Sequence, residues 1–101
     1  MSRRAQIEAM LKEDPRDSFL RYALALELAG AGELTQAVAA LEGLLADQPD
    51  YIPAYLQAGQ FLLKAGDAGK ARTVLEAGVA AALAGRDDHA AEEMAALLQA
   101  L

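Results

Sequence analysis

The single histidine of the chain stands among acidic residues. His89 directly follows Asp88, and Glu92 and Glu93 come about one helical turn later. Imidazole and carboxylate groups at this spacing could hold a metal ion or transfer protons. A structural zinc site needs about four ligands, and the chain has neither a second histidine nor a cysteine. We therefore expect His89 to be an exposed side chain in the last helix, with no metal site and no catalytic role.

The two serines, Ser2 and Ser18, are further candidate nucleophiles. Neither lies in a Gly-x-Ser-x-Gly turn, and neither has a second histidine to complete a triad. The glycines at 30–32 and 66–69 follow expected helices rather than strands, which is typical of helix ends and not of phosphate-binding loops. We expect neither enzymatic activity nor a bound cofactor.

The composition is that of one helical domain. The 101 residues include 25 alanines and 17 leucines, and the chain is 54% hydrophobic but only 5% aromatic. Alanine and leucine are strong helix formers and β-branched residues are scarce, so we expect an all-α fold. A chain of this length has room for one core and one domain.

The net charge of −6 argues against two classes of partner. Nucleic acids and anionic membranes attract basic proteins, whereas this chain has 9 basic and 15 acidic residues. No apolar run approaches the roughly 20 residues of a membrane span, and the residues before Pro15 lack a signal-peptide core. The absence of cysteine suits a reducing compartment. We expect a cytoplasmic protein that binds neither nucleic acid nor membranes.

Proline, glycine and aspartate divide the chain into segments of helical length. The breaks fall at residues 14–15, 30–32, 48–50, 66–67 and 85–87. Each of the six segments carries an apolar stripe at helical spacing. We expect Asp17 or Ser18 to cap the second helix, Asp50 the fourth, and Asp87 or Asp88 the sixth.

The chain also repeats itself with a period of 34 residues. A shift of 34 superposes Pro15 on Pro49 and gives eight identities, which fall at turns and at helix-contact positions. The segment from Ala5 to Leu11 superposes on the second half of the repeat. The first helix is therefore interpreted as half of an incomplete unit.

This pattern resembles the tetratricopeptide repeat family, whose unit is a helix-turn-helix of this length. In the second unit, Tyr55 and Gly59 match the family's aromatic and small positions in the first helix, and Gly78 matches the last small position of the second helix. The first unit departs from the pattern at two of these positions, with Arg21 in place of the aromatic and Leu44 in place of the small residue. The chain resembles a small, single-domain protein of the bacterial type in this family.

The resemblance implies a right-handed α-solenoid of antiparallel helix pairs, with about six helices in one domain spanning residues 1–101. Residues 18–50 and 52–84 are predicted to form two repeats. Residues 3–15 would form an N-terminal half-repeat, and residues 86–101 a C-terminal capping helix, because each helix pair exposes an apolar face that the next must cover.

The resemblance also implies that the first helix of each pair lines a concave surface. The family's ligand-facing positions, placed on this sequence, are mostly apolar, as suits a groove that holds a peptide or a helix. The predicted peptide-binding residues are Phe19, Tyr22, Leu26, Leu56, Gln60, Leu63, Lys64 and Met94. The family's clamp for chaperone C-termini uses asparagines, and this chain has none.

Two alternatives to this groove stay open. The predicted residues could belong to the core, if the last helix folds across the concave surface. An exposed apolar side, or the stripe from Met94 to Leu101, could instead be buried in a homodimer. The leading prediction is a non-enzymatic interaction module or scaffold for an unidentified protein or peptide partner.

Overall fold

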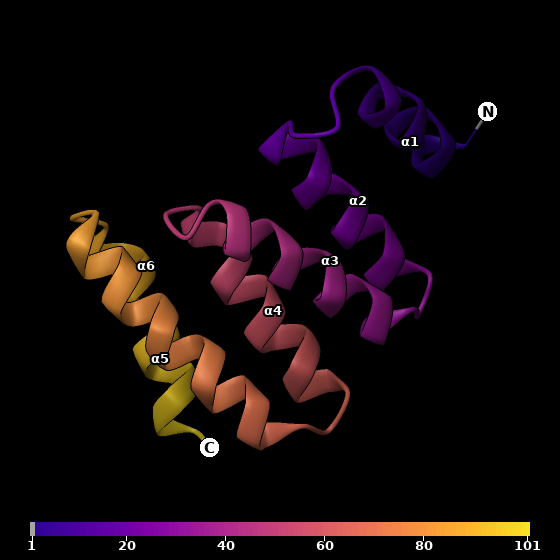
Figure 1. The fold of residues 1–101 in the computed structure, drawn as a ribbon. Helices are drawn as coiled ribbons and strands as arrows, with labels where there is room; N and C mark the ends of the chain where they lie inside the picture. Colours follow the sequence, from indigo (N-terminus) through magenta and orange to yellow (C-terminus); the bar gives the residue numbers. More distant parts are fainter. Residues whose placement is uncertain (1) are drawn as a thin grey trace.

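The computed structural model describes residues 2–101, which form six α-helices and no β-strand. In chain order the helices are α1 (Arg3–Glu13), α2 (Ser18–Gly30), α3 (Leu34–Asp47), α4 (Ile52–Lys64), α5 (Ala68–Ala84) and α6 (Asp88–Gln99). They follow one another across the molecule, so that the N- and C-termini lie at opposite ends (Figure 1). The prediction of an all-α fold is confirmed.

Each helix packs mainly against its neighbours in the chain. α2 packs closely with α3 and α4 with α5, while the contact between α3 and α4 joins these two pairs. α1 packs against α2, and α6 packs against α5 with a smaller contact to α4. The resulting array measures 41 × 29 × 19 Å. Contacts mainly between neighbouring helices are typical of stacked helical repeats.

Side-chain caps explain where four of the helices begin. Ser2, Asp17, Asp67 and Asp87 each accept a hydrogen bond from a backbone N–H three residues later, at 2.9 to 3.1 Å. The caps predicted at positions 17 and 87 are thus confirmed. The prediction for Asp50 is wrong, because α4 begins one residue further on with Tyr51 as its N-cap and no side-chain cap. A proline in the first turn of α4 favours the helical backbone there instead.

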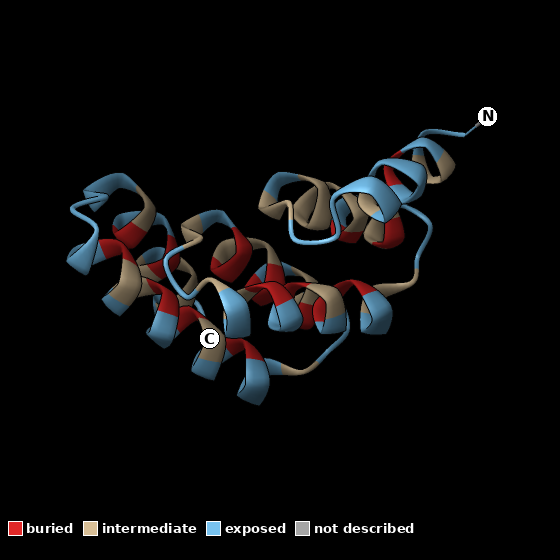
Figure 2. Cartoon of the chain, turned by 45° about the horizontal axis from the view of Figure 1, so that its top comes forward, coloured by how far each residue is buried: buried red, intermediate tan, exposed pale blue. Residues whose placement is uncertain are grey.

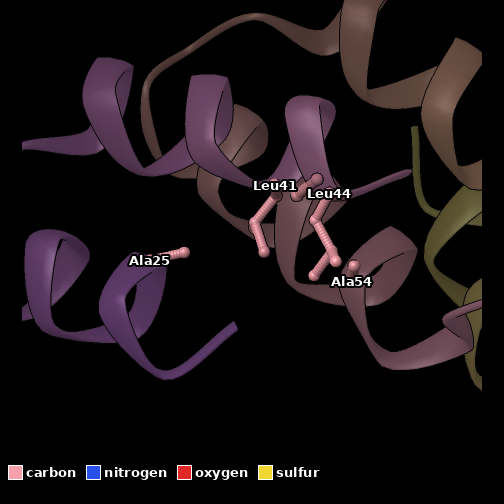
Figure 3. Close-up of a cluster of buried hydrophobic side chains, with 5 residues drawn as sticks. Ala25, Leu41, Leu44 and Ala54 are labelled. Atoms are coloured by element: carbon pink, nitrogen blue, oxygen red, sulfur yellow. The ribbon is translucent and has the colours of Figure 1, made fainter. Parts of the chain in front are cut away.

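The core consists of alanine and leucine side chains where the helices approach one another. Ala25, Leu41, Leu44 and Ala54 come from three helices, are fully buried and pack together (Figure 3). Within residues 2–101 no polar or charged residue is buried. The buried residues face neighbouring helices and the exposed ones lie on the outer sides (Figure 2). Apolar packing therefore holds the array together, and small alanines allow the helices to come close.

Two glycines mark the closest helix contacts. A Cβ atom at Gly78 would lie 2.6 Å from the Cβ of Tyr55, and a Cβ atom at Gly59 would lie 2.6 Å from the Cγ of Leu75. Neither contact leaves room for a methyl group. These are positions where the repeat pattern implies a small residue, and the close approach is the physical reason.

The pair formed by α2 and α3 carries its bulky apolar residue on the second helix, whereas the pair formed by α4 and α5 carries it on the first. Arg21 and Leu44 stand 34 residues before Tyr55 and Gly78. Leu44 is fully buried, whereas Arg21 forms an ion pair with Asp47, with 2.8 Å between Nη1 and Oδ2. In the first pair the large apolar side chain therefore lies on α3, opposite a polar residue of α2. In the second pair the large side chain, Tyr55, lies on α4, opposite the glycine of α5.

Candidate functional site

Three of the predicted binding residues lie along one side of α2. Phe19, Tyr22 and Leu26 are spaced three and four residues apart, which places them on the same face of the helix. Phe19 is 67% exposed and Leu26 is 36% exposed, while Tyr22 is half-buried and packs against the core. The last helix therefore does not cover Phe19 or Leu26, and two large apolar side chains meet the solvent beside a tyrosine.

The Tyr22 side chain is held in place by residues of α4 and its N-cap. Its ring centroid lies 5.6 Å from that of Tyr51, with 51° between the ring planes. Burial raises the pKa of Tyr22 above its ordinary value of 10.0, and a hydrogen bond with the Gln57 side chain partly offsets this. The hydroxyl is therefore neutral near pH 7 and keeps its proton, which it can donate in a further hydrogen bond. Tyr51 and Gln57 were not predicted as site residues. Tyr51 precedes α4, so helical periodicity gives no signal for it.

Four more predicted residues lie on α4. Gln60 and Lys64 are exposed, and Leu56 and Leu63 are half-buried, with the two leucines packed against the core. Their spacing places all four on one side of the helix. α4 thus adds an amide and an ammonium group to the apolar residues of α2.

Met94 does not belong to this surface. Its side chain is fully buried in the cluster that contains Tyr55, Leu75 and Ala82. The sequence-based placement of Met94 at the binding face is therefore corrected to the core. The reason is a change in register, because α5 has 17 residues where α3 has 14.

The change in register moves other residues of α6 to the outer side. α6 begins 36 residues after α4 rather than 34. At this offset Glu92 and Ala96 correspond to Leu56 and Gln60, and both are exposed. An acidic and a small residue therefore stand where an apolar contact was expected.

The C-terminal stripe proposed for a homodimer is largely used within the fold. Met94 is buried, and Leu97 and Leu98 are half-buried against the core. Leu101 is 39% exposed. Little of this stripe is left to contact a second copy.

The residues considered for catalysis are dispersed. His89 is exposed, and its Nε2 lies 3.2 Å from Oε1 of Glu93 on the same helix. In residues 2–101 no three histidine, aspartate or glutamate side chains gather in a way that could hold a metal ion. Over the same residues, no helix combines the length and apolar character needed to span a membrane.

The two arginines near the N-terminus fasten α1 to the rest of the array. Arg3 forms an ion pair with Glu27 of α2, and Arg4 forms one with Glu33, the N-cap of α3, each with 2.9 Å between nitrogen and oxygen. The buried Ile7 provides the apolar part of the same contact. These basic residues are therefore engaged within the molecule.

Two of the three described cavities lie elsewhere, between α3 and α5. The first has a volume of about 510 Å³ and is walled by these two helices, with α4 as its floor. The second, of about 380 Å³, shares Glu42, Leu62 and Lys70 with the first, so the two are continuous. We call this joint depression the α3–α5 groove. None of the eight residues predicted to bind a partner lines it.

The α3–α5 groove and the predicted residues occupy opposite sides of α4. Tyr55, Ala58 and Leu62 line the groove, and at 100° per residue they point roughly 180° away from Gln60 and Lys64. A sequence signal for the groove exists in α5, where small residues recur every four positions. They are Gly69, Thr73, Ala77 and Ala81.

Comparison with known proteins agrees with this architecture. Residues 28–101 match a protein family described as tetratricopeptide repeat. No curated protein matches the chain. The solution structure of a protein from Bordetella parapertussis is 28% identical, with a TM-score of 0.85 over 98% of this chain and 86% of that chain. The solution structure of a tetratricopeptide repeat domain protein from Salinibacter ruber is 27% identical, with a TM-score of 0.80 over 85% of this chain and 87% of that chain.

The family match covers well over half of the sequence, and the similar structures share the arrangement of the helices. Repeats of this kind generally mediate protein–protein interactions, and the proteins that contain them are generally non-enzymatic scaffolds. This chain belongs to the tetratricopeptide repeat family.

Proposed function

We propose that this chain is a non-enzymatic interaction module that holds a peptide or helical segment of a partner protein. The binding surface is the α2–α4 face, which consists of Phe19, Tyr22, Leu26, Leu56, Gln60, Leu63 and Lys64. The observation that supports it most strongly is the 67% exposure of Phe19 beside the partly exposed Leu26. α2 and α4 are the first helices of their pairs, and in a repeat of this family such helices would line the concave surface. We place the module in the cytoplasm, because a chain without cysteine suits a reducing compartment.

Burial of the exposed apolar side chains supplies the driving force for binding. Complete burial of a leucine or phenylalanine side chain contributes about 1.5–3 kcal/mol. The Tyr22 ring is already packed against Tyr51, so less side-chain entropy is lost when a partner contacts it. With so few anchors the complex should be weak and transient.

Polar groups at one edge of the face would orient the bound segment. The Lys64 ammonium attracts a carboxylate, and the Gln60 amide can both donate and accept hydrogen bonds. Both side chains are exposed. A segment with apolar anchors for Phe19 and Leu26 and an acidic or polar residue near Lys64 therefore fits this face best.

A charged substitution in the α2–α4 face tests the proposal. Phe19→Asp should remove the partner from proteins that co-purify with the tagged chain, because a carboxylate cannot be buried in an apolar contact without a large desolvation cost. Leu83→Asp is the matched control, since Leu83 is also exposed, at 57%, but lies on α5.

The comparison is informative because both variants should fold. Circular dichroism should give the same helix content and thermal midpoint for both, within a few degrees. Loss of a specific co-purifying protein with Phe19→Asp alone supports the α2–α4 face. An unchanged set of proteins from a folded Phe19→Asp variant would refute it.

A further inference from the structure

We propose that the α3–α5 groove is a second docking surface, which takes a basic amphipathic helix of a partner protein. It lies on the opposite side of α4 from the α2–α4 face and shares no residue with it. The inference therefore goes beyond the proposed function and does not depend on it.

The groove is long enough for several turns of helix. Its residues extend along α3 from Leu34 to Ala46 and along α5 from Gly69 to Ala77. A separate cavity of about 520 Å³ lies further along α5, at Ala81 and Ala84 near the end of the helix. The 17 residues of α5 span about 25 Å.

The chemistry of the walls favours a helix over an extended strand. Leu45, Leu62 and Val74 make the interior apolar, and the walls are helices whose backbone groups are already paired. The Thr73 hydroxyl is also occupied, because its Oγ1 donates to the Gly69 carbonyl at 3.3 Å. An extended segment would leave its own N–H and C=O groups without partners here, whereas a helix satisfies them internally.

The charges around the groove select a basic helix. Glu42 and Lys70 face the depression from opposite walls, and in residues 2–101 neither forms an ion pair. Asp67 adds a carboxylate at one end of the groove, and Asp50 and Asp87 line a separate cavity further along α5. Two carboxylates against one ammonium group in the groove, with two more carboxylates beyond it, attract lysine and arginine side chains.

The same charges disfavour a second copy of this chain as the occupant. Each copy carries a net charge of −6, so two copies repel each other. Two facing depressions would also leave the apolar interior unfilled, whereas a helix presents a ridge of side chains that can enter it.

The repeat itself supplies a matched pair of variants. Glu42 and Glu76 occupy equivalent positions 34 residues apart, and both are exposed. Glu42 lines both cavities of the groove, whereas Glu76 lines none of the described cavities. Glu42→Lys and Glu76→Lys change the net charge by the same amount, so only the position of the charge differs.

The probe is a synthetic amphipathic helix added to the full chain at low ionic strength. It has about 18 residues, or about 27 Å of helix, with leucines on one face and lysines on the other. A second peptide carries glutamate in place of every lysine. Amide chemical shifts of the isotope-labelled protein report where each peptide binds and how tightly.

Saturable shifts of α3 and α5 amides with the lysine peptide support the inference. The glutamate peptide should bind at least about tenfold more weakly, and Glu42→Lys should weaken binding of the lysine peptide about fivefold. Glu76→Lys should change its affinity less than about twofold, because exposed charges away from the contact are screened.

Several results would overturn the inference that the α3–α5 groove binds a basic helix. These are equal binding of the two peptides, equal effects of the two substitutions, or no saturable shift with the lysine peptide. Shifts confined to α2 and the outer side of α4 would instead place the peptide on the α2–α4 face. Concentration-dependent shifts of groove residues without peptide would assign the groove to a second copy. The Phe19→Asp result is independent of all of these outcomes.

Discussion

At the scale of single residues, Gly78 is a position that leaves no room for a side chain. A Cβ atom there would lie 2.6 Å from the Cβ of Tyr55 and 2.5 Å from the Sδ of Met94. We predict that Gly78→Ala lowers the free energy of unfolding by about 1–3 kcal/mol, because overpacking outweighs the gain in helix propensity. Urea denaturation followed by circular dichroism measures the change.

Gly30 is the control for that substitution. It is the last residue of α2, and a Cβ atom there would meet nothing within 4 Å. Gly30→Ala should therefore be neutral, or stabilise the fold by up to about 1 kcal/mol. Equal destabilisation by the two substitutions would mean that the close approach of α4 and α5 is not the reason for a glycine at position 78.

Tyr55 joins α4 to the turn that precedes it. Its hydroxyl donates a hydrogen bond to the Pro49 carbonyl at 2.6 Å. Tyr55→Phe removes this donor and should lower the free energy of unfolding by about 1 kcal/mol. A change below about 0.3 kcal/mol would show that water replaces the hydroxyl without loss.

The raised pKa of Tyr55 predicts that the stability of the fold depends on pH. Burial, followed by the charge of Asp50, raises the pKa of Tyr55 in the folded state above 10.0. Its contribution to stability is therefore fully present below about pH 10 and is lost as the pH rises through the folded-state pKa. Denaturation at about pH 9 and pH 11 should show a smaller loss of stability for Tyr55→Phe than for the unaltered chain.

At the scale of helix pairs, the reversed residue sizes of the two repeats predict coupling. Arg21→Tyr would place a ring beside Leu44, and Leu44→Gly would leave a cavity costing about 2–5 kcal/mol. The two together recreate the arrangement of Tyr55 and Gly78. The double variant should therefore be more stable than the sum of the single effects by at least about 1 kcal/mol. Effects that add to within about 0.5 kcal/mol would contradict this account of the pair.

The helix pairs also show how far the sequence predicts the structure. The apolar stripes, the repeat and the caps at Asp17 and Asp87 were enough to predict six helices and an all-α fold. The position of α6 was not predictable from a fixed 34-residue period, because α5 is three residues longer than α3. That extension is the reason Met94 lies in the core.

The binding surfaces were predicted less completely than the helices. Periodicity places Phe19 and Leu26 on one side of α2, and the structure leaves both exposed. The periodicity of the sequence carries no information about residues outside the helices, such as Tyr51, or about the distance between α3 and α5. The α3–α5 groove depends on that distance, so it becomes visible only in three dimensions.

At the scale of the whole molecule, we predict that the isolated chain is a monomer. Like charges repel copies of net charge −6, and most of the C-terminal apolar stripe is packed within the fold. Light scattering over a range of concentrations should give the mass of a single chain, 10.6 kDa. A mass near twice that value at high concentration would favour the homodimer instead.

The central claim is that a partner protein contacts the α2–α4 face, and site-specific photo-cross-linking tests it most directly. A photoreactive phenylalanine analogue at position 19 or at position 83 replaces an exposed apolar side chain in either case. In living cells the analogue at position 19 should cross-link one discrete protein, and excess unaltered chain should compete with it. Cross-links from position 83 that match those from position 19, or only self-cross-links at position 19, would contradict the claim.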